Sequence, residues 1–291
     1  MIDSIIIYFK NLPHVLNYSL KHVKNLWKWF TVSFIVGLVL IFAVEIFFKV
    51  TNATEMIQGV WLYRLLTLLA YGYIVLSLFL CYKIYAKDYM ITKSFKISPV
   101  TPIVVTTIAG GILLFVLMTI IAIWKPINFE SSLLATIYFM LVTIVLNCLL
   151  SVLFGLVKIL NHKADIYFYI FCVIEFILVP IIYVPKTHLT MIGHVLMLNP
   201  FYYVTNGLAQ SVLFGRVSLA NIPYHLYILC FILILCLINF ALSHFVSHFV
   251  SHAKYRNKNK NTQSTIQSNH FLSNANHIKD SDNSEIDKNN N

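Results

Sequence analysis

The sequence predicts an all-α integral membrane protein, and three observations support this fold class. Hydrophobic residues make up 59% of the 291-residue chain and charged residues only 11%, whereas soluble domains carry about 25% charged residues. The mean hydropathy is +0.77. The apolar residues gather in six segments, each near the ~20 residues that a bilayer-crossing helix needs. This composition excludes a soluble enzyme, a disordered protein and a secreted disulfide scaffold.

The charge of the connections between the six predicted spans predicts how the chain is oriented in the membrane. They cover roughly residues 30–48, 60–82, 101–124, 132–157, 166–184 and 224–246. Of the 21 Lys and Arg residues, sixteen lie on the side of the predicted spans that also carries the N-terminal and C-terminal segments. Four lie on the opposite side. Because Lys and Arg are enriched in cytoplasmic loops, we expect a multi-pass protein of a bacterial plasma membrane with both termini cytoplasmic. The net charge of +10 has the same origin and predicts no nucleic-acid partner.

The chain divides into three predicted regions. Residues 1–29 form a cytoplasmic amphipathic helix, residues 30–252 form the six-span domain, and residues 253–291 form a disordered cytoplasmic tail rich in Asn and Ser. The amphipathic helix has an apolar stripe bordered by lysines, formed by Leu16, Leu20, Val23, Trp27 and Phe30. Such a helix lies flat among the lipid headgroups, or it is a plain anchor beside the first span.

The connection at residues 83–100 predicts a short cytoplasmic helix that lies across the membrane surface. Ile84, Ile91 and Phe95 fall near one helical face, and prolines then end the helix and open the third span. The polar residues of this segment are Lys87, Asp88, Lys93 and Lys96. Such a helix would dock a cytoplasmic partner, whereas the alternative is a solvated connector whose lysines only obey the charge rule.

Residues 185–223 are apolar but interrupted by Pro and Gly, so they predict two outward half-depth helices before the last span. The two pieces, about 187–198 and 200–214, are too short to cross a bilayer. Asn199 is a candidate N-cap, with Pro200 at the first helical position. The aromatic residues that follow, Phe201, Tyr202 and Tyr203, either line a path for sugar rings or anchor the helix at the membrane interface.

Two further features concern ionisable side chains in or beside the spans. Glu175 is the deepest acid, and an ionisable group at that depth is a functional-site hypothesis by default. It handles protons or cations, or it makes a hydrogen bond inside the bundle. His244, His248 and His252 share one face of the last helix. An i, i+4 His pair can hold zinc, but without a nearby carboxylate or cysteine a polar stripe at headgroup level is the simpler interpretation.

The sequence contains no phosphate-binding loop of the GxxxxGK[ST] type, no HExxH and no GxSxG. A phosphate-binding loop supplies backbone N–H groups and a lysine to nucleotide phosphates, so this chain is not expected to bind ATP by that route. No catalytic, cofactor-binding or metal-binding residues are predicted, and the protein is expected not to be an enzyme.

Two stretches carry a resemblance to a known family. Residues 178–216 contain the segment PIIYVP, which includes Tyr183, and the Asn199-Pro200 turn with its aromatic residues. Residues 85–106 contain the segment SFKISP. With the order of elements over residues 10–250, these stretches resemble the permease subunit of ABC exporters of the polysaccharide and teichoic-acid class. That family often carries a basic-acidic pair after its fourth span.

Here Lys158 stands after the fourth span, and the nearest acid is Asp165. The resemblance implies a homodimer of permeases with two copies of a separate ATP-binding subunit, which would carry ATP and Mg. The expected cargo is a lipid-linked polymer, such as teichoic acid or another cell-wall polysaccharide. The helix at 83–100 would couple the ATPase to the spans, and the outward gate or path would involve Glu175, Tyr183, Asn199, Pro200, Phe201, Tyr202 and Tyr203.

Two other functions stay open at this point. A permease of the same fold would move a drug, a peptide or a lipid, and only an assay of the cargo separates the two. A membrane-embedded enzyme or regulatory protein would have no ATPase partner. The missing catalytic motifs argue against an enzyme, and the interrupted segment before the last span argues for a transport path.

Overall fold

The computed structural model describes the backbone of residues 2–94, 98–161, 163–184 and 191–249, and its regular elements are helices. The chain separates into two units, Met1–Leu242 and Ser243–Asn291. In the second unit the described residues, 243–249, are helical. The predicted tail, with His252, lies outside the described residues.

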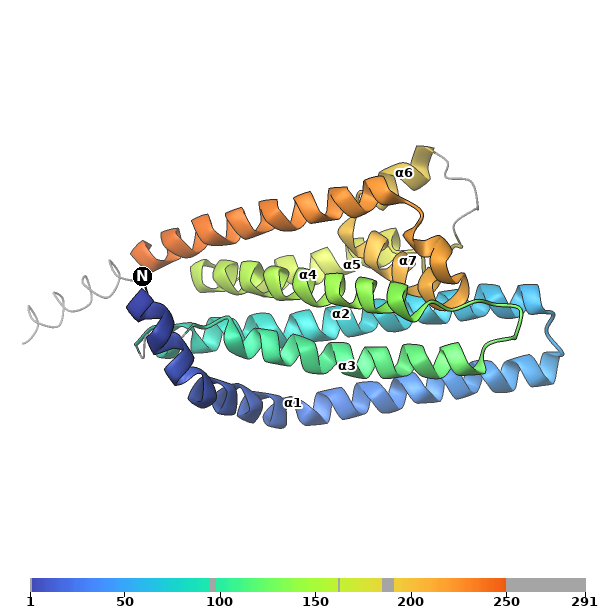
Figure 1. The fold of residues 1–291 in the computed structure, drawn as a ribbon, viewed down its shortest axis with the longest axis horizontal. Helices are drawn as coiled ribbons and strands as arrows, with labels where there is room; N and C mark the ends of the chain where they lie inside the picture. Colours follow the sequence, from blue (N-terminus) through green and yellow to red (C-terminus); the bar gives the residue numbers. More distant parts are fainter. Residues whose placement is uncertain (1, 95–97, 162, 185–190, 250–291) are drawn as a thin grey trace, which may run out of the picture. The chain divides into compact units, whose positions relative to one another are not determined.

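The first unit is a bundle of long helices with short ones beside them (Figure 1). Its elements are α1 (Ile2–Thr51), α2 (Glu55–Ser94), α3 (Thr101–Trp124), α4 (Leu133–Leu160), α5 (Ala164–Leu178), α6 (Met191–Met197), α7 (Pro200–Leu213) and the 3-10 helix η1 (Gly215–Leu219). A final helix covers Ile222–Phe249. Helices α1 and α3, α2 and α3, and α2 and α4 pack against each other, as the ribbon shows.

Five helices of the described chain are long and apolar enough to cross a membrane: α1 from Leu16, α2 as far as Tyr89, α3, α4 and Ile222–Phe249. This confirms a multi-pass, all-α membrane protein. Large apolar side chains such as Val39, Leu141 and Phe240 are exposed, as expected for helices that face lipid instead of water.

The predicted fifth span, 166–184, is shorter than expected. Helix α5 has 15 residues and ends at Leu178. The cause is Pro180, because proline disfavours the helical conformation of the residue before it. Val179 has ψ of 143° and is extended. The structure therefore contains a helix at this place, but not one long enough by itself to span.

The prediction of a separate short helix at 83–100 is wrong for the part that the structure describes. Residues 83–94 continue α2 without a break. The sequence has neither Gly nor Pro between Leu80 and Ser94, so nothing interrupts the hydrogen-bond ladder where the apolar composition ends. Phe95 and Lys96 lie outside the described residues.

Helix α1 likewise joins the predicted amphipathic helix to the first span, from Ile2 to Thr51. Figure 1 shows that α1 bends between its first part and the rest. In the predicted apolar stripe, Leu16, Leu20 and Trp27 are exposed, whereas Phe30 is buried. An exposed apolar stripe beside lysines is the pattern of a helix at a lipid surface.

Candidate functional site

Helix α7 is the most completely buried short helix of the first unit, and we take it as the candidate functional site. All its residues from Phe201 to Leu213 are buried except Gln210. It lies at the end of the bundle where α2 and α4 begin (Figure 1). The backbone N–H of Ser132 donates to the Ser211 carbonyl at 2.9 Å, and the hydroxyls of Thr136 and Ser211 are 3.0 Å apart. These contacts fix the C-terminal half of α7 to the start of α4.

The N-terminus of α7 is capped by Asn199, as predicted. Its side-chain oxygen accepts from the backbone N–H of Phe201 at 2.8 Å and of Tyr202 at 3.4 Å. Its amide nitrogen donates to the Glu175 carboxylate at 2.6 Å. An Asn side chain offers an acceptor and two donors, so the carboxylate on α5 fixes which end of the amide points at α7. Glu175, only 9% exposed, thus makes a hydrogen bond inside the bundle.

A buried polar network joins the middle of α7 to α2. The Tyr63 hydroxyl donates to the Asn206 side-chain oxygen at 2.6 Å, and the Gln210 amide donates to the same oxygen at 3.0 Å. Asn206 is 1% exposed. Because an unpaired polar group in an apolar interior is costly, this arrangement specifies one position for α7 against α2.

A second polar cluster joins α7 to α4 and the final helix. The Tyr203 hydroxyl forms a hydrogen bond with Nδ1 of His225, and it lies 3.3 Å from the Tyr138 hydroxyl. The other ring nitrogen of His225 is 3.2 Å from the Leu219 carbonyl oxygen. Since a carbonyl only accepts, Nε2 of His225 carries a hydrogen and donates to it.

The predicted aromatic residues of this region lie inside the bundle. Phe201, Tyr202 and Tyr203 are at most 4% exposed. Tyr183 packs with its ring nearly parallel to Tyr202, 6.5 Å between centroids, and its hydroxyl donates to the Leu178 carbonyl at 3.0 Å. Phe201, Tyr202 and Tyr203 therefore pack against other residues of the first unit.

Sequence reasoning missed Tyr63, Tyr138, Asn206 and His225. The sequence did contain a signal: the two amide side chains of this segment, Asn206 and Gln210, stand four residues apart, so they share one helix face. Tyr63, the partner of Asn206, and Tyr138, the partner of Tyr203, carried no signal, because they lie among many aromatic residues of the spans.

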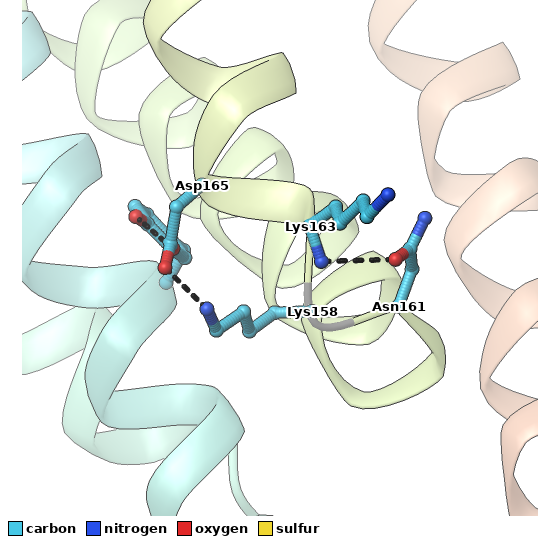
Figure 2. A network of polar contacts seen from close by, with 5 residues as sticks. Lys158, Asn161, Lys163 and Asp165 are labelled. Carbon is cyan, nitrogen blue, oxygen red and sulfur yellow. Dashed lines mark hydrogen bonds and ion pairs between the residues drawn. The ribbon is translucent and has the colours of Figure 1, made fainter.

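A polar contact lies toward the other end of the bundle, and Figure 2 shows it. Lys158 at the end of α4 forms an ion pair with Asp165 at the start of α5, although seven residues separate them. The Tyr82 hydroxyl donates to the same carboxylate at 2.9 Å. The hydrogen bond from Lys158 lowers the pKa of Asp165 from its ordinary value; burial opposes this shift and Tyr82 adds to it. The contact joins α2, α4 and α5.

Two of the residues predicted to couple the spans to an ATPase are buried within this chain. Ile84 is 8% exposed and Asp88 3%. The Asp88 carboxylate pairs with Nε2 of His22 on α1 at 2.9 Å. Lys87 is exposed. Ile91 and Lys93 lie in the last turns of α2.

In comparisons with known proteins, no family model and no curated protein matches this sequence. Within the described part of the chain no group of three His, Cys, Asp or Glu side chains is arranged to hold a metal ion. The rings of His244 and His248 lie 4.6 Å apart between centroids.

Proposed function

We propose that this chain is the membrane-spanning subunit of an ATP-driven exporter that moves a lipid-linked glycopolymer across the plasma membrane. The observation that carries this proposal is α7, a helix of 14 residues buried among spanning helices. Short helices at membrane depth are tolerated only inside protein or beside a water-filled cavity, and they are typical of transport paths.

The order of the helices supports an exporter of the ABC type. A long first helix, two spans joined by a basic segment, two further helices, a pair of short helices and a last helix follow one another as in the family that the sequence resembles. In this proposal the chain works as a homodimer, and two copies of a separate subunit bind ATP and Mg.

The proposed topology has six crossings, with α6 and α7 as half-depth helices on the outer side of the membrane. Helix α5 spans about 22 Å at 1.5 Å per residue, less than the ~30 Å of hydrocarbon. The residues after it, 179–184, complete the crossing in this proposal, where the Pro180 carbonyl accepts from the Thr67 hydroxyl on α2 and the Tyr183 ring stacks on Tyr202 of α7. Both termini are then cytoplasmic.

The distribution of charge supports entry of an anionic cargo from the cytoplasm. Lys21, Lys24 and Lys28 on α1 and Lys83 and Lys87 on α2 are exposed. Along α2, Lys87 lies about 36 Å from Tyr63, so these lysines are far from α7. A basic surface raises the local concentration of a phosphate-bearing polymer.

Controlled depletion of the chain tests the proposed cargo. We expect lipid-linked polymer to accumulate on the cytoplasmic side, and plasmid-borne wild-type protein to restore export. Two matched variants are compared in the same way. Asn206→Leu removes the hydrogen bond from α7 to Tyr63 and should fail to restore export. Asn128→Leu removes an exposed amide and should restore it. Accumulation of a drug, a peptide or an ordinary phospholipid instead would contradict a glycopolymer cargo.

A further inference from the structure

A groove lies beside α7, between the connection from α3 to α4 and the 3-10 helix η1. Its cavity volume is about 640 Å³, within the roughly 300–1,000 Å³ of sites that bind small molecules. We call it the Glu130–Arg216 groove. The residues that line it include Glu130, Ser131, Ser132, Leu133, Arg216 and Leu219.

The backbone of both walls of this groove is held in place. Glu130 and Phe214 form a parallel bridge, and Ser132 is hydrogen-bonded to Ser211. Gly215 has a φ of +62°, and a Cβ there would lie 3.5 Å from the Glu130 backbone. Only glycine adopts this conformation readily, so the backbone turn at the start of η1 favours glycine, whereas the 3.5 Å distance is an ordinary van der Waals contact. A site with fixed walls binds a ligand without first having to order them.

Two opposite charges line the groove without neutralising each other. Among the residues that the structure describes, Glu130 and Arg216 form no ion pair or side-chain hydrogen bond, and both are exposed. Lys125 lies close enough to Glu130 for the two charges to interact. Burial lowers the pKa of Lys125 and the charge of Glu130 raises it, while its ammonium donates to the Phe129 carbonyl at 2.5 Å. The groove thus offers an unpaired guanidinium and an unpaired carboxylate.

We propose that the Glu130–Arg216 groove binds a phosphate ester of a polyol or sugar. The planar guanidinium of Arg216 matches two phosphate oxygens. Glu130 repels a bare phosphate but accepts hydrogen bonds from hydroxyl groups, and the hydroxyls of Ser131 and Ser132 are further partners. Ser132 accepts from the Ala135 N–H at 3.3 Å, which leaves its O–H free to donate. The apolar side chains of Leu133 and Leu219 suit the carbon face of the ligand.

This inference deepens the proposed function, because it names the chemistry of the repeating unit that meets the chain beside α7. Two sources carry the same chemistry: a soluble glycerol phosphate polymer and the headgroup of phosphatidylglycerol. Binding requires neither an ATPase nor transport, so a negative result here and a failure of the proposed exporter function are distinguishable.

The test uses the full chain in nanodiscs of phosphatidylcholine alone, titrated with a short glycerol phosphate oligomer or with inorganic phosphate. We expect the oligomer to bind more tightly than phosphate. Arg216→Gln should weaken oligomer binding about tenfold or more, because hydrogen bonds to charged groups are the strong ones. Glu130→Gln should weaken binding of the oligomer but not of phosphate. Lys49→Gln removes an exposed charge that does not line the groove, and should change neither.

Nanodiscs that contain phosphatidylglycerol identify the source. If the lipid competes with the oligomer, and less of it co-purifies with Arg216→Gln, the headgroup occupies the groove; if it does not compete, the polymer is the ligand. Either result supports a polyol phosphate site. Equal losses for Arg216→Gln and Lys49→Gln, or equal affinity for oligomer and phosphate, would overturn the proposal, since binding would then reflect diffuse charge. Size-exclusion profiles confirm that each variant is folded.

Discussion

The Asn199 side chain makes two contacts, and the second of them gives the buried acid Glu175 a hydrogen-bond donor. The amide oxygen caps α7 and the amide nitrogen binds Glu175. If the amide turned by 180°, its nitrogen would face the backbone N–H groups of α7 and its oxygen would face a carboxylate. Both contacts would be repulsive, so each partner selects the same orientation.

This arrangement predicts that the carboxylate and the amide of Glu175 and Asn199 can be exchanged between the two positions. Asp is as good an N-cap as Asn, yet Asn199→Asp places two carboxylates in contact, which disfavours ionisation of both. We expect a loss of about 1–2 kcal/mol of unfolding free energy at pH 8, measured as a lower melting temperature in detergent. Adding Glu175→Gln to this variant supplies an amide donor to the new carboxylate and should restore most of the loss. Equal stability of Asn199→Asp and wild type would contradict this role of Glu175.

The contact of Lys158 with Asp165 predicts a dependence on acid pH. Because the folded-state pKa of Asp165 is lowered, its ionised form stabilises the fold above its ordinary pKa of about 3.9. That contribution is lost as the pH falls through the lowered value. Melting temperatures of wild type and Asp165→Asn should therefore differ at pH 6 and converge at the acid end. Since the Asp165 side chain is 37% exposed, added salt should reduce the difference in melting temperature. A difference that grows toward low pH would contradict a stabilising role of the ionised carboxylate.

At the scale of the elements, the sequence predicted helix starts and breaks where a specific residue enforces them. Asn199-Pro200 begins α7 at the predicted place. The ends assigned from apolar composition were less accurate, because composition marks where lipid contact stops and not where a helix stops. Helices α1 and α2 therefore continue beyond their predicted limits. Helix α5 ends earlier than predicted, because Pro180 disfavours a helical conformation of Val179. The burial of α7 depends on contacts with Tyr63 and Thr136, distant in sequence, which periodicity within α7 cannot supply.

Close packing of α7 on α4 predicts a strong effect at one glycine. A Cβ on Gly207 would lie 2.1 Å from the ring of Phe139, which is itself 1% exposed and has little room to move. Gly207→Ala should cost about 1–3 kcal/mol, as overpacking does. The matched control is Gly72→Ala, which meets nothing within 4 Å and should be neutral or stabilise by up to about 1 kcal/mol. Similar melting temperatures for the two variants would show that α7 is not packed as described.

At the scale of the whole molecule, the side of the membrane on which each end of the chain lies depends on whether α5 crosses. Five helices of spanning length would place the two ends of the chain on opposite sides, whereas a crossing by α5 places them on the same side. The start of α5 and the segment after α7 then lie on opposite sides of the bilayer.

Single-cysteine labelling decides this in a background with the five native cysteines replaced. An impermeant thiol reagent applied from outside should reach Thr54→Cys and Arg216→Cys but not Lys93→Cys or Lys163→Cys. Labelling of Lys163→Cys and Arg216→Cys from the same side would mean that α5 does not cross. Labelling of Lys93→Cys but not Thr54→Cys from outside would reverse the whole orientation.

The central claim, an ATP-driven exporter subunit, is tested most directly by purifying the tagged chain from its native membrane in mild detergent and measuring bound ATPase. The account predicts a separate ATP-binding subunit in equal amount, with ATP hydrolysis. It predicts loss of that subunit, or of cargo-stimulated hydrolysis, in Phe95→Asp. The new carboxylate would stand in the ATPase contact that the family resemblance implies, and an unpaired charge buried in a contact costs several kcal/mol. The control Ile266→Asp, in the predicted tail, should retain both. A wild-type chain that purifies without any ATPase, or a Phe95→Asp chain that keeps binding and stimulated hydrolysis intact, would contradict the account.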